Sequence, residues 1–331
     1  MPNNVHSRSR NSEFPLMLPR TFLRRYLRRW VMFAVLVAVA MPGLARTVTD
    51  MLGRTVTVPD RIERVFGSAP PLNVLLHAVA PEAMVGVSFP IPEPAGRYFP
   101  PSVRKLPVVG GIFGMGQQMN AETVLALRPD VALAWQSPFI DRERIESAFA
   151  KMGVPVVFIR LDDLDDWPAA LRFAGRLLGR EAAAENKAAD IEQVLQRLRA
   201  AVAAVPSEGR PRVYYAEGAD GLATDCHRSF HTEAIELAGG YNVYRCTPKD
   251  HMGMERISLE QVLAFNPEVI LVQEPAAMAA IGADPRWAAI SAVQSGRIPF
   301  VPRWPHNWRN CKFCGRYRLK NSRSLPTAWA A

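Results

Sequence analysis

Two kinds of stretch alternate along most of this chain. Short apolar runs, such as residues 131–135, are followed by longer stretches in which apolar residues recur at helical spacing. Short apolar runs between helices are typical of buried strands in a parallel sheet, so the pattern predicts an α/β fold. The expected strands are residues 64–68, 84–88, 106–109, 131–135, 154–159, 212–216, 269–273 and 297–301.

Helices are expected wherever apolar positions return every three or four residues. The longest such stretch, residues 181–205, contains no proline or glycine. At about 1.5 Å per residue this helix would be about 37 Å long, enough to cross a domain boundary. A hairpin is expected over residues 47–59, and five prolines within residues 89–101 predict a loop there. The other expected helices are residues 70–80, 141–152, 166–178, 231–238 and 285–293.

One unit is written twice in the sequence, at residues 120–135 and again at residues 258–273. In each copy a residue that favours a helix start, Asn120 or Ser258, precedes a short helical stretch, a proline and an apolar run. The residue before a proline is pushed out of the α region, so each helix ends there and a strand follows. Two distant copies of this unit predict two similar α/β lobes, which the long helix would join.

The N-terminal segment has the composition of a secretory signal peptide. An arginine-rich stretch precedes the apolar run 30–41, which is too short to cross a bilayer, and small residues follow as far as Ala45. Cleavage is expected after about Ala45, which would release the protein into the periplasm. The predicted organisation is a signal peptide (1–45), an N-terminal α/β lobe (46–179), a linking helix (180–206), a C-terminal α/β lobe (207–302) and an atypical basic tail (303–331).

The formal net charge of +9 belongs to the two ends of the chain. Residues 46–302 hold 26 Lys and Arg against 30 Asp and Glu. A nucleic-acid footprint needs basic residues clustered on the folded body, so nucleic acid is not an expected partner. In the tail, Cys311 and Cys314 have the spacing of half a zinc site or a redox pair. No second pair accompanies them, so the tail is expected to be unstructured.

The chain resembles the helix-hinged (class III) periplasmic solute-binding proteins, which serve ABC importers of iron-siderophores, haem and vitamin B12. The resemblance covers about residues 47–302, and the tail departs from it because the closing helices of the class are not found there. Its motifs are Asp50-Met51-Leu52-Gly53-Arg54, Leu106-Pro107-x-Val109-Gly110, Asn120-x-Glu122, Leu127-x-Pro129-Asp130, Gly239-Gly240-x-Asn242 and Ser258-x-Glu260-Gln261.

This resemblance implies a ligand cleft between two lobes and a permease in the inner membrane as partner. In the vitamin B12-binding members of the class, glutamates at the positions of Glu122 and Glu260 form salt bridges with arginines of the permease. The resemblance therefore implies permease docking through these two residues. A carboxylate in the first turn of a helix is also favoured by the helix dipole alone, by about 0.3–1 kcal/mol, and needs no partner for that.

Candidate ligand contacts in the first lobe follow from the expected strand ends. Parallel sheets bind ligands beyond the carboxyl ends of their strands, and several polar and aromatic residues fall there. The aromatic ones suit a large, flat ligand, although half of the set could belong to the lobe core. These candidates are Ser68, Asn73, Phe113, Met115, Gln117, Trp135 and Phe139.

The second lobe concentrates side chains that bind transition metals. Imidazole and thiolate suit such metals, and His or Tyr can be an axial haem ligand. The candidates are His227, His231, His251 and Tyr215, close in sequence to Cys226, Cys246, Met252 and Met254. Cys226 and Cys246 could instead form a disulfide in an oxidising compartment, His231 could start a helix, and the methionines could be packing.

Taken together, the sequence predicts a periplasmic receptor that captures a metal chelate and delivers it to a permease, with no cofactor of its own. An iron-siderophore is the first expectation for the ligand; haem, a corrinoid, a nickel complex and an oxyanion are the alternatives. A secreted hydrolase is a distant alternative, since neither a Gly-x-Ser-x-Gly elbow nor a His-Glu-x-x-His helix is present. A structural adhesin is a third class, which the paired α/β lobes disfavour.

Overall fold

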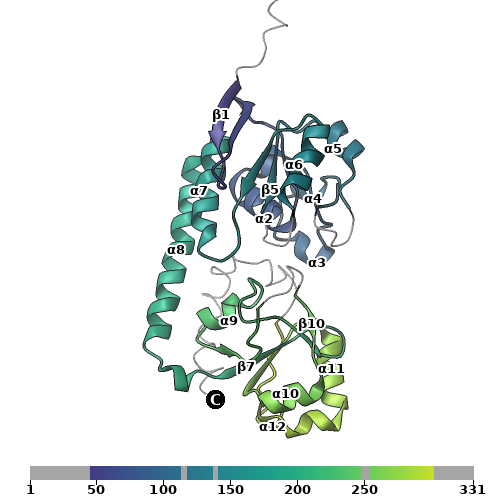
Figure 1. Ribbon diagram of the computed structural model, residues 1–331, viewed down its shortest axis with the longest axis vertical. Helices are drawn as coiled ribbons and strands as arrows, with labels where there is room; N and C mark the ends of the chain where they lie inside the picture. Colours follow the sequence, from purple (N-terminus) through teal and green to yellow (C-terminus); the bar gives the residue numbers. More distant parts are fainter. Residues whose placement is uncertain (1–44, 113–117, 137–140, 248–252, 302–331) are drawn as a thin grey trace, which may run out of the picture. The chain divides into compact units, whose positions relative to one another are not determined.

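The first lobe is built on a parallel four-stranded sheet with the strand order β4-β3-β5-β6 (Figure 1). The computed structural model describes residues 45–112, 118–136, 141–247 and 253–301. All residues of the four strands are buried, as expected for a parallel sheet with helices on both faces. The strands are β3 (Val65–Gly67), β4 (Met84–Gly86), β5 (Val131–Trp135) and β6 (Val156–Ile159).

Successive strand residues of this sheet point to opposite faces and enter separate cores. One core contains Leu133 of β5 together with apolar residues of α2 (Pro70–Val79), α7 (Asp166–Leu178) and α8 (Glu181–Ala203). The other contains Ala132 together with residues of α5 (Ala121–Leu127) and α6 (Arg142–Lys151). The strand-period alternation of side chains therefore produces a three-layered lobe.

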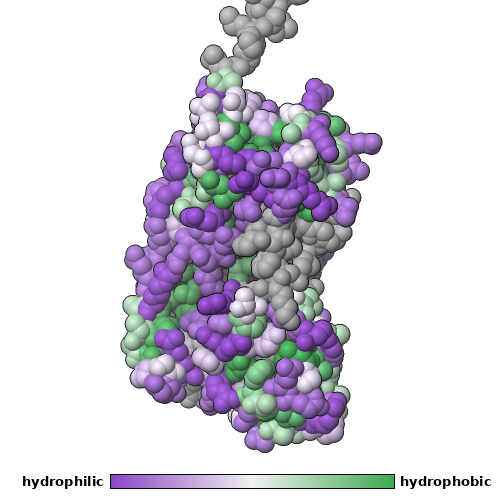
Figure 2. All heavy atoms as spheres, in the orientation of Figure 1, coloured by the Kyte–Doolittle hydropathy of each residue, from purple (hydrophilic) through white to green (hydrophobic). Residues whose placement is uncertain are grey.

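The long helix α8 packs along α7 in the first lobe and also contacts α9 (Glu233–Leu237) in the second lobe. Its 23 residues correspond to about 35 Å at 1.5 Å per residue. Arg172 of α7 forms bidentate hydrogen bonds with both Glu185 and Glu192 of α8. Figure 2 shows hydrophilic side chains over this face of α7 and α8. The predicted long helix is confirmed, and it connects the two lobes.

The second lobe has a smaller parallel sheet in the order β11-β7-β9. Its strands are β7 (Arg212–Ala216), β9 (Tyr241–Asn242) and β11 (Val269–Val272). A separate antiparallel pair, β8 (Ala223–Thr224) and β10 (Glu255–Arg256), lies beside it. The remaining helices are α10 (Leu259–Phe265), α11 (Pro275–Ala283) and α12 (Ser291–Gln294), with the 3₁₀ turn η3 (Pro285–Ala289) between the last two.

The sequence repeat is a structural repeat. Helices α5 and α10 begin with the predicted caps, because the Asn120 side chain accepts from the Thr123 N–H and Ser258 forms a capping box with Gln261. Both helices end on a non-glycine residue in the left-handed region, Arg128 or Asn266. Each is followed by a buried proline and a strand, as the sequence predicts.

A second pair of matched acids in the repeat has a structural role. The carboxylate of Asp130 accepts from the backbone N–H groups of Glu63 and Arg64. At the same place in the other copy, Glu268 accepts from the backbone N–H of Arg212. Each acid therefore ties the start of one strand to the start of its neighbour, which accounts for an acid at this position in both copies.

Several predicted elements differ from those observed. The proline-rich segment predicted as loop contains two short helices, α3 (Glu93–Gly96) and α4 (Pro101–Arg104). Both have proline within the first two helical positions, where its missing N–H costs nothing. The predicted strands 106–109 and 297–301 are reduced to isolated bridges, Val87 with Val108 and Val272 with Phe300. Helix α11 was not predicted at all.

The motif at the start of the folded body locks the first hairpin to the sheet. This hairpin consists of β1 (Ala45–Thr49) and β2 (Thr55–Pro59), and between them lies the buried Asp50. Its carboxylate accepts from the backbone and side chain of Arg54 and from the backbone N–H of Phe158 in β6. The Arg54 guanidinium also lies 4.4 Å from the centre of the Phe158 ring.

Replacing Asp50 with alanine is expected to lower the free energy of unfolding by about 1–3 kcal/mol, because the buried N–H of Phe158 and the Nε–H of Arg54 lose their acceptor. The Arg54 guanidinium keeps its ion pair with Glu146. The matched control is Glu63→Ala, which removes an exposed partner of Arg61 and should cost less than about 1 kcal/mol. Urea denaturation of both variants measures the difference. Equal midpoints would show that the Asp50 network does not hold the hairpin.

The predicted signal peptide and the basic tail, with Cys311 and Cys314, lie outside the described residues. Within the part of the chain that the structure describes, no helix is both long and apolar enough to span a bilayer.

Candidate ligand site

The candidate site in the second lobe begins where the antiparallel pair of strands ends. Glu255 of β10 is paired with Thr224 of β8. The next residues outward on the two strands are Asp225 and Met254, so the ribbon brings two loops together at this point. One loop, residues 225–232, carries two of the candidate histidines.

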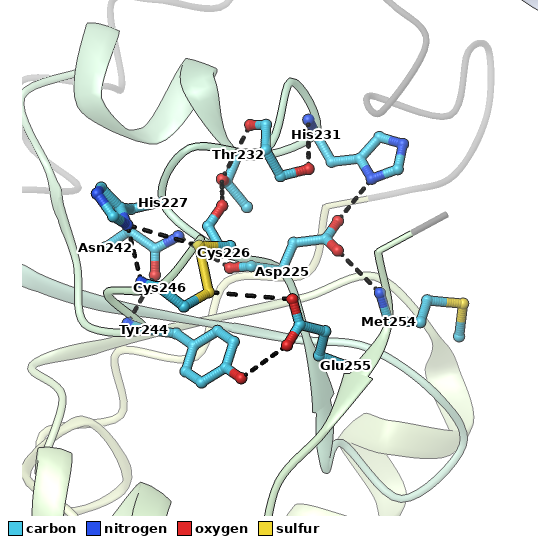
Figure 3. The surroundings of a disulfide bond; sticks show 11 residues. Asp225, Cys226, His227, His231, Thr232, Asn242, Tyr244, Cys246, Met254 and Glu255 are labelled. Carbon is cyan, nitrogen blue, oxygen red and sulfur yellow. Dashed lines mark hydrogen bonds and ion pairs between the residues drawn. A yellow bond between two sulfur atoms is a disulfide. The ribbon is translucent and has the colours of Figure 1, made fainter. Parts of the chain in front are cut away.

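A disulfide closes this region (Figure 3). Cys226 is bonded to Cys246, with 5.3 Å between their Cα atoms. Of the two interpretations left open by the sequence, metal binding or a disulfide, the structure therefore contains the disulfide. The bond links the 225–232 loop to the segment that follows β9, and Asn242 reinforces it by donating from its amide to the Asp225 carbonyl at 3.1 Å.

The loop is further closed on itself by short-range hydrogen bonds. The Thr232 hydroxyl donates to the Cys226 carbonyl at 2.7 Å, and the Ser229 N–H donates to the same oxygen at 2.8 Å. Both side chains are buried. A loop with this many internal partners holds its side chains in fixed directions.

His231 is oriented by a carboxylate. Its Nδ1 lies 2.7 Å from Oδ2 of Asp225, and the Asp225 side chain is fully buried. Figure 3 shows the other ring nitrogen, Nε2, on the side of the imidazole that faces away from this carboxylate. A histidine whose second nitrogen is held by a carboxylate is the arrangement found behind many metal-ligating imidazoles.

His227 is held in the opposite way. Its Nδ1 accepts from the backbone N–H of Cys246 at 3.1 Å, so a neutral His227 carries its proton on Nε2. Burial lowers the pKa of this imidazole, as do the nearby Arg245 and Arg228, which favours the neutral form. His227 is therefore arranged to support the disulfide loop, and its remaining nitrogen is a donor.

An aromatic contact joins the site to the first lobe. Trp135, the last residue of β5, meets Phe230 edge to face with ring centroids 5.3 Å apart. Phe230 in turn lies 4.0 Å from the His231 ring. The indole N–H of Trp135 donates to Asp162 at 3.3 Å. Of the sequence-predicted candidates, Trp135 and His231 are thus brought together from opposite lobes through Phe230.

Three other candidates, Ser68, Asn73 and Tyr215, are buried. Ser68 follows β3 and is fully buried, and its hydroxyl has no hydrogen-bond partner among the described residues. The Asn73 amide is 3.0 Å from the Ser88 hydroxyl and links α2 to the end of β4. Tyr215 is a core residue of β7. The candidates Phe113, Met115, Gln117, Phe139 and His251 lie outside the described residues.

Two residues of this site were missed in the sequence, Asp225 and Phe230. Asp225 is next to a candidate cysteine and six residues before His231. Its role is to orient the His231 ring, and no local sequence pattern indicates that contact. Phe230 is adjacent to His231. The preference for aromatic ligand contacts, which selected candidates in the first lobe, would have selected Phe230 if it had been applied to the second lobe as well. Among the described side chains, no group of three or more His, Cys, Asp or Glu residues is placed to hold a metal ion.

The two matched glutamates of the repeat are exposed at the second helical position of α5 and α10. Hydrogen bonds from its own backbone N–H and from Ser258 lower the pKa of Glu260. Glu122 lies in the equivalent first turn after its Asn120 cap. Each lobe therefore presents one carboxylate to solvent at the same place in its repeat.

Comparisons with known proteins agree with this architecture. A solved ABC transporter solute-binding protein from Sulfurospirillum deleyianum superposes with a TM-score of 0.74 and 29% identity, covering 85% of this chain and 94% of that chain. A vitamin B12-binding protein of Pectobacterium carotovorum is 29% identical over 63% of this chain and 71% of its own length. The molybdate-binding protein MolA of Haemophilus influenzae is 27% identical over 92% of this chain and 89% of its own. The molybdate-bound structure of MolA superposes with a TM-score of 0.69 and 25% identity, covering 86% and 93% of the two chains.

Two α/β lobes joined by one long helix thus define a two-lobed binding protein of the helix-hinged class. Residues 84–303 match the periplasmic binding protein family, and the chain belongs to that family. The resemblance inferred from the sequence motifs is confirmed.

Proposed function

We propose that this protein is the solute-binding component of an ABC importer, which captures a metal chelate and delivers it to a permease in the inner membrane. Membership of the periplasmic binding protein family supports a binding role, and the similar protein from Sulfurospirillum deleyianum is described as an ABC transporter solute-binding protein. The expected ligand is an iron-siderophore first, with haem, a corrinoid or a nickel complex behind it.

The observation that carries this proposal is the orientation of His231. Its imidazole is fixed by a buried carboxylate and lies beside the aromatic pair Phe230 and Trp135. One imidazole supplies one metal ligand, so a metal held by His231 would bring its remaining ligands with it, as a chelate does. The aromatic rings suit the flat or apolar edges of such a ligand.

An oxyanion is the second candidate, and two observations favour it. MolA, which matches nearly the whole chain, is described as a molybdate-binding protein. In addition, the Ser68 hydroxyl is buried and has no partner among the described residues, and a hydroxyl in that position could donate to an anionic oxygen. A hydrolase stays a distant alternative, and an active-site serine probe should leave a binding protein unlabelled.

A titration that follows tryptophan fluorescence tests the ligand class, because Trp135 lies in the contact between the lobes. The probes are ferric bis-catecholate, which has open coordination positions, ferric tris-catecholate, which has none, haemin, aquocobalamin and sodium molybdate. We expect the ferric bis-catecholate to bind more tightly than the saturated tris complex. If molybdate is the only probe that binds, the ligand class is an oxyanion and the proposed chelate is wrong.

We also infer export and processing from the N-terminal composition. The first described strand, β1, starts at Ala45, which is where the sequence places the cleavage site. N-terminal sequencing of protein recovered from the periplasm should therefore begin at about Arg46. Recovery of the uncut chain from the membrane fraction would instead indicate an anchor.

A further inference from the structure

Asp225 is the hub that connects the two loops of the second-lobe site. It follows β8 directly, is completely buried and makes contacts in three directions. Oδ2 is 2.7 Å from His231 Nδ1, Oδ1 accepts from the Met254 N–H at 2.8 Å, and the backbone carbonyl accepts from Asn242 at 3.1 Å.

The backbone of the facing loop is shaped around this carboxylate. Gly253 has a φ of +65°, and a Cβ atom added to it would lie 1.6 Å from Oδ1 of Asp225. The next residue, Met254, also has a positive φ, of 57°. Left-handed backbone at a residue with a side chain is uncommon and persists where the surroundings require it. Here the requirement is an N–H directed at Asp225.

The carboxylate determines which nitrogen of His231 carries the proton. An ionised carboxylate only accepts hydrogen bonds, so Nδ1 must be the donor. A neutral His231 then has its lone pair on Nε2, the nitrogen that faces away from Asp225 (Figure 3). His227, four residues earlier, has the opposite tautomer because its Nδ1 accepts from a backbone N–H.

We propose that Asp225 is a positioning residue, which holds His231 as the Nδ1–H tautomer and so presents Nε2 as the nitrogen that binds the ligand. The disulfide and the hydrogen bonds of the 225–232 loop keep the carboxylate and the imidazole in register. The proposal rests on the function proposed above only for what Nε2 binds; the tautomer itself is a property of the protein without ligand.

The tautomers are measured directly by ¹⁵N NMR of histidine-labelled protein without ligand. The spectra are recorded while the pH is raised until the shifts of both rings stop changing, so that both imidazoles are neutral. We expect His231 to keep its proton on Nδ1 and His227 to keep its proton on Nε2, so that one spectrum contains both cases. A proton on Nε2 of His231 would overturn the proposal without any variant being made.

Asp225→Asn tests the positioning role. The amide can accept from Met254 with its oxygen, but its NH₂ group then faces His231 and favours the Nε2–H tautomer. In the variant we expect the His231 proton to move to Nε2 and ferric bis-catecholate to bind about 10- to 100-fold more weakly, the usual range when a residue that orients a metal-binding side chain is lost. The control is Asp284→Asn, a half-buried acid paired with Arg286 away from this site, which should change neither result.

The outcomes separate this proposal from the proposed function. If the wild-type and variant tautomers are as expected but no metal probe binds the wild type, the positioning role stands and the chelate is wrong. If the variant keeps the Nδ1–H tautomer and full affinity, Asp225 does not position His231. Thermal unfolding and a thiol titration check that the variant is folded and that its disulfide is intact.

Discussion

Replacement of His231 with glutamine is expected to weaken binding of ferric bis-catecholate by about 100-fold or more, which corresponds to about 2.7 kcal/mol. The magnitude follows from removing the imidazole that is proposed to bind the metal, since loss of a residue that orients such an imidazole already costs about 10- to 100-fold. Glutamine keeps a polar group near Asp225 but offers no imidazole nitrogen. Fluorescence titration and isothermal calorimetry of the same protein preparation provide the measurement.

His77→Gln is the matched control for this variant. His77 lies on α2, partly buried against the Phe99 ring, and burial lowers the pKa of its imidazole. Its replacement changes one histidine of the first lobe and should leave the affinity within about twofold. Equal affinity of wild type and His231→Gln for every metal probe would show that His231 does not bind the ligand.

The double variant Glu122→Gln with Glu260→Gln is expected to lose transport while it retains ligand binding. Glutamine can still occupy the first turn of each helix, so the fold and the ligand site should be unchanged. What is lost is one exposed negative charge on each lobe, and together these would grip a basic partner surface at two points and fix its orientation. We expect the ligand-stimulated ATPase of the reconstituted permease to fall about tenfold, equivalent to about 1.4 kcal/mol, with each single variant intermediate.

A matched pair of exposed acids serves as control for the docking variant. Glu63 and Glu208 are exposed, one on each lobe, and neither lies in the repeated helices. Replacing both with glutamine removes the same charge and should leave the ATPase rate unchanged. If both double variants reduce the rate equally, the effect is one of net charge. Full transport in the Glu122/Glu260 variant would leave only the helix-dipole explanation for those acids.

The parts of the fold that the sequence predicted are those with strong local signals. The caps Asn120 and Ser258 and the prolines that follow each helix define the repeat without any tertiary information. Helix α11 has no such signal, because its sequence PAAMAAIGA is apolar on nearly every side and shows no helical periodicity. The short helices α3 and α4 were predicted as loop because of their prolines, although proline is also common in the first turn of a helix.

The candidate site was predictable only in part, because its geometry depends on pairs far apart in the chain. The cluster of soft ligands in the second lobe predicted His231 as a candidate, and the position of Trp135 at the end of a parallel strand predicted it as another. The contact of Trp135 with Phe230 joins residues almost one hundred positions apart. Likewise, the pairing of Asp225 with Met254 requires the β8–β10 ribbon, whose two-residue strands are too short to be recognised in a sequence.

The central claim, that this protein carries a metal chelate, is tested most directly on protein purified from its own periplasm without unfolding. Native mass spectrometry combined with an absorbance spectrum gives the mass of the bound ligand and the state of its metal. We predict a complex whose added mass contains a metal and an organic chelator, with a charge-transfer, Soret or corrin band that shifts in His231→Gln. A bound oxyanion such as molybdate, or a ligand without metal, would contradict it.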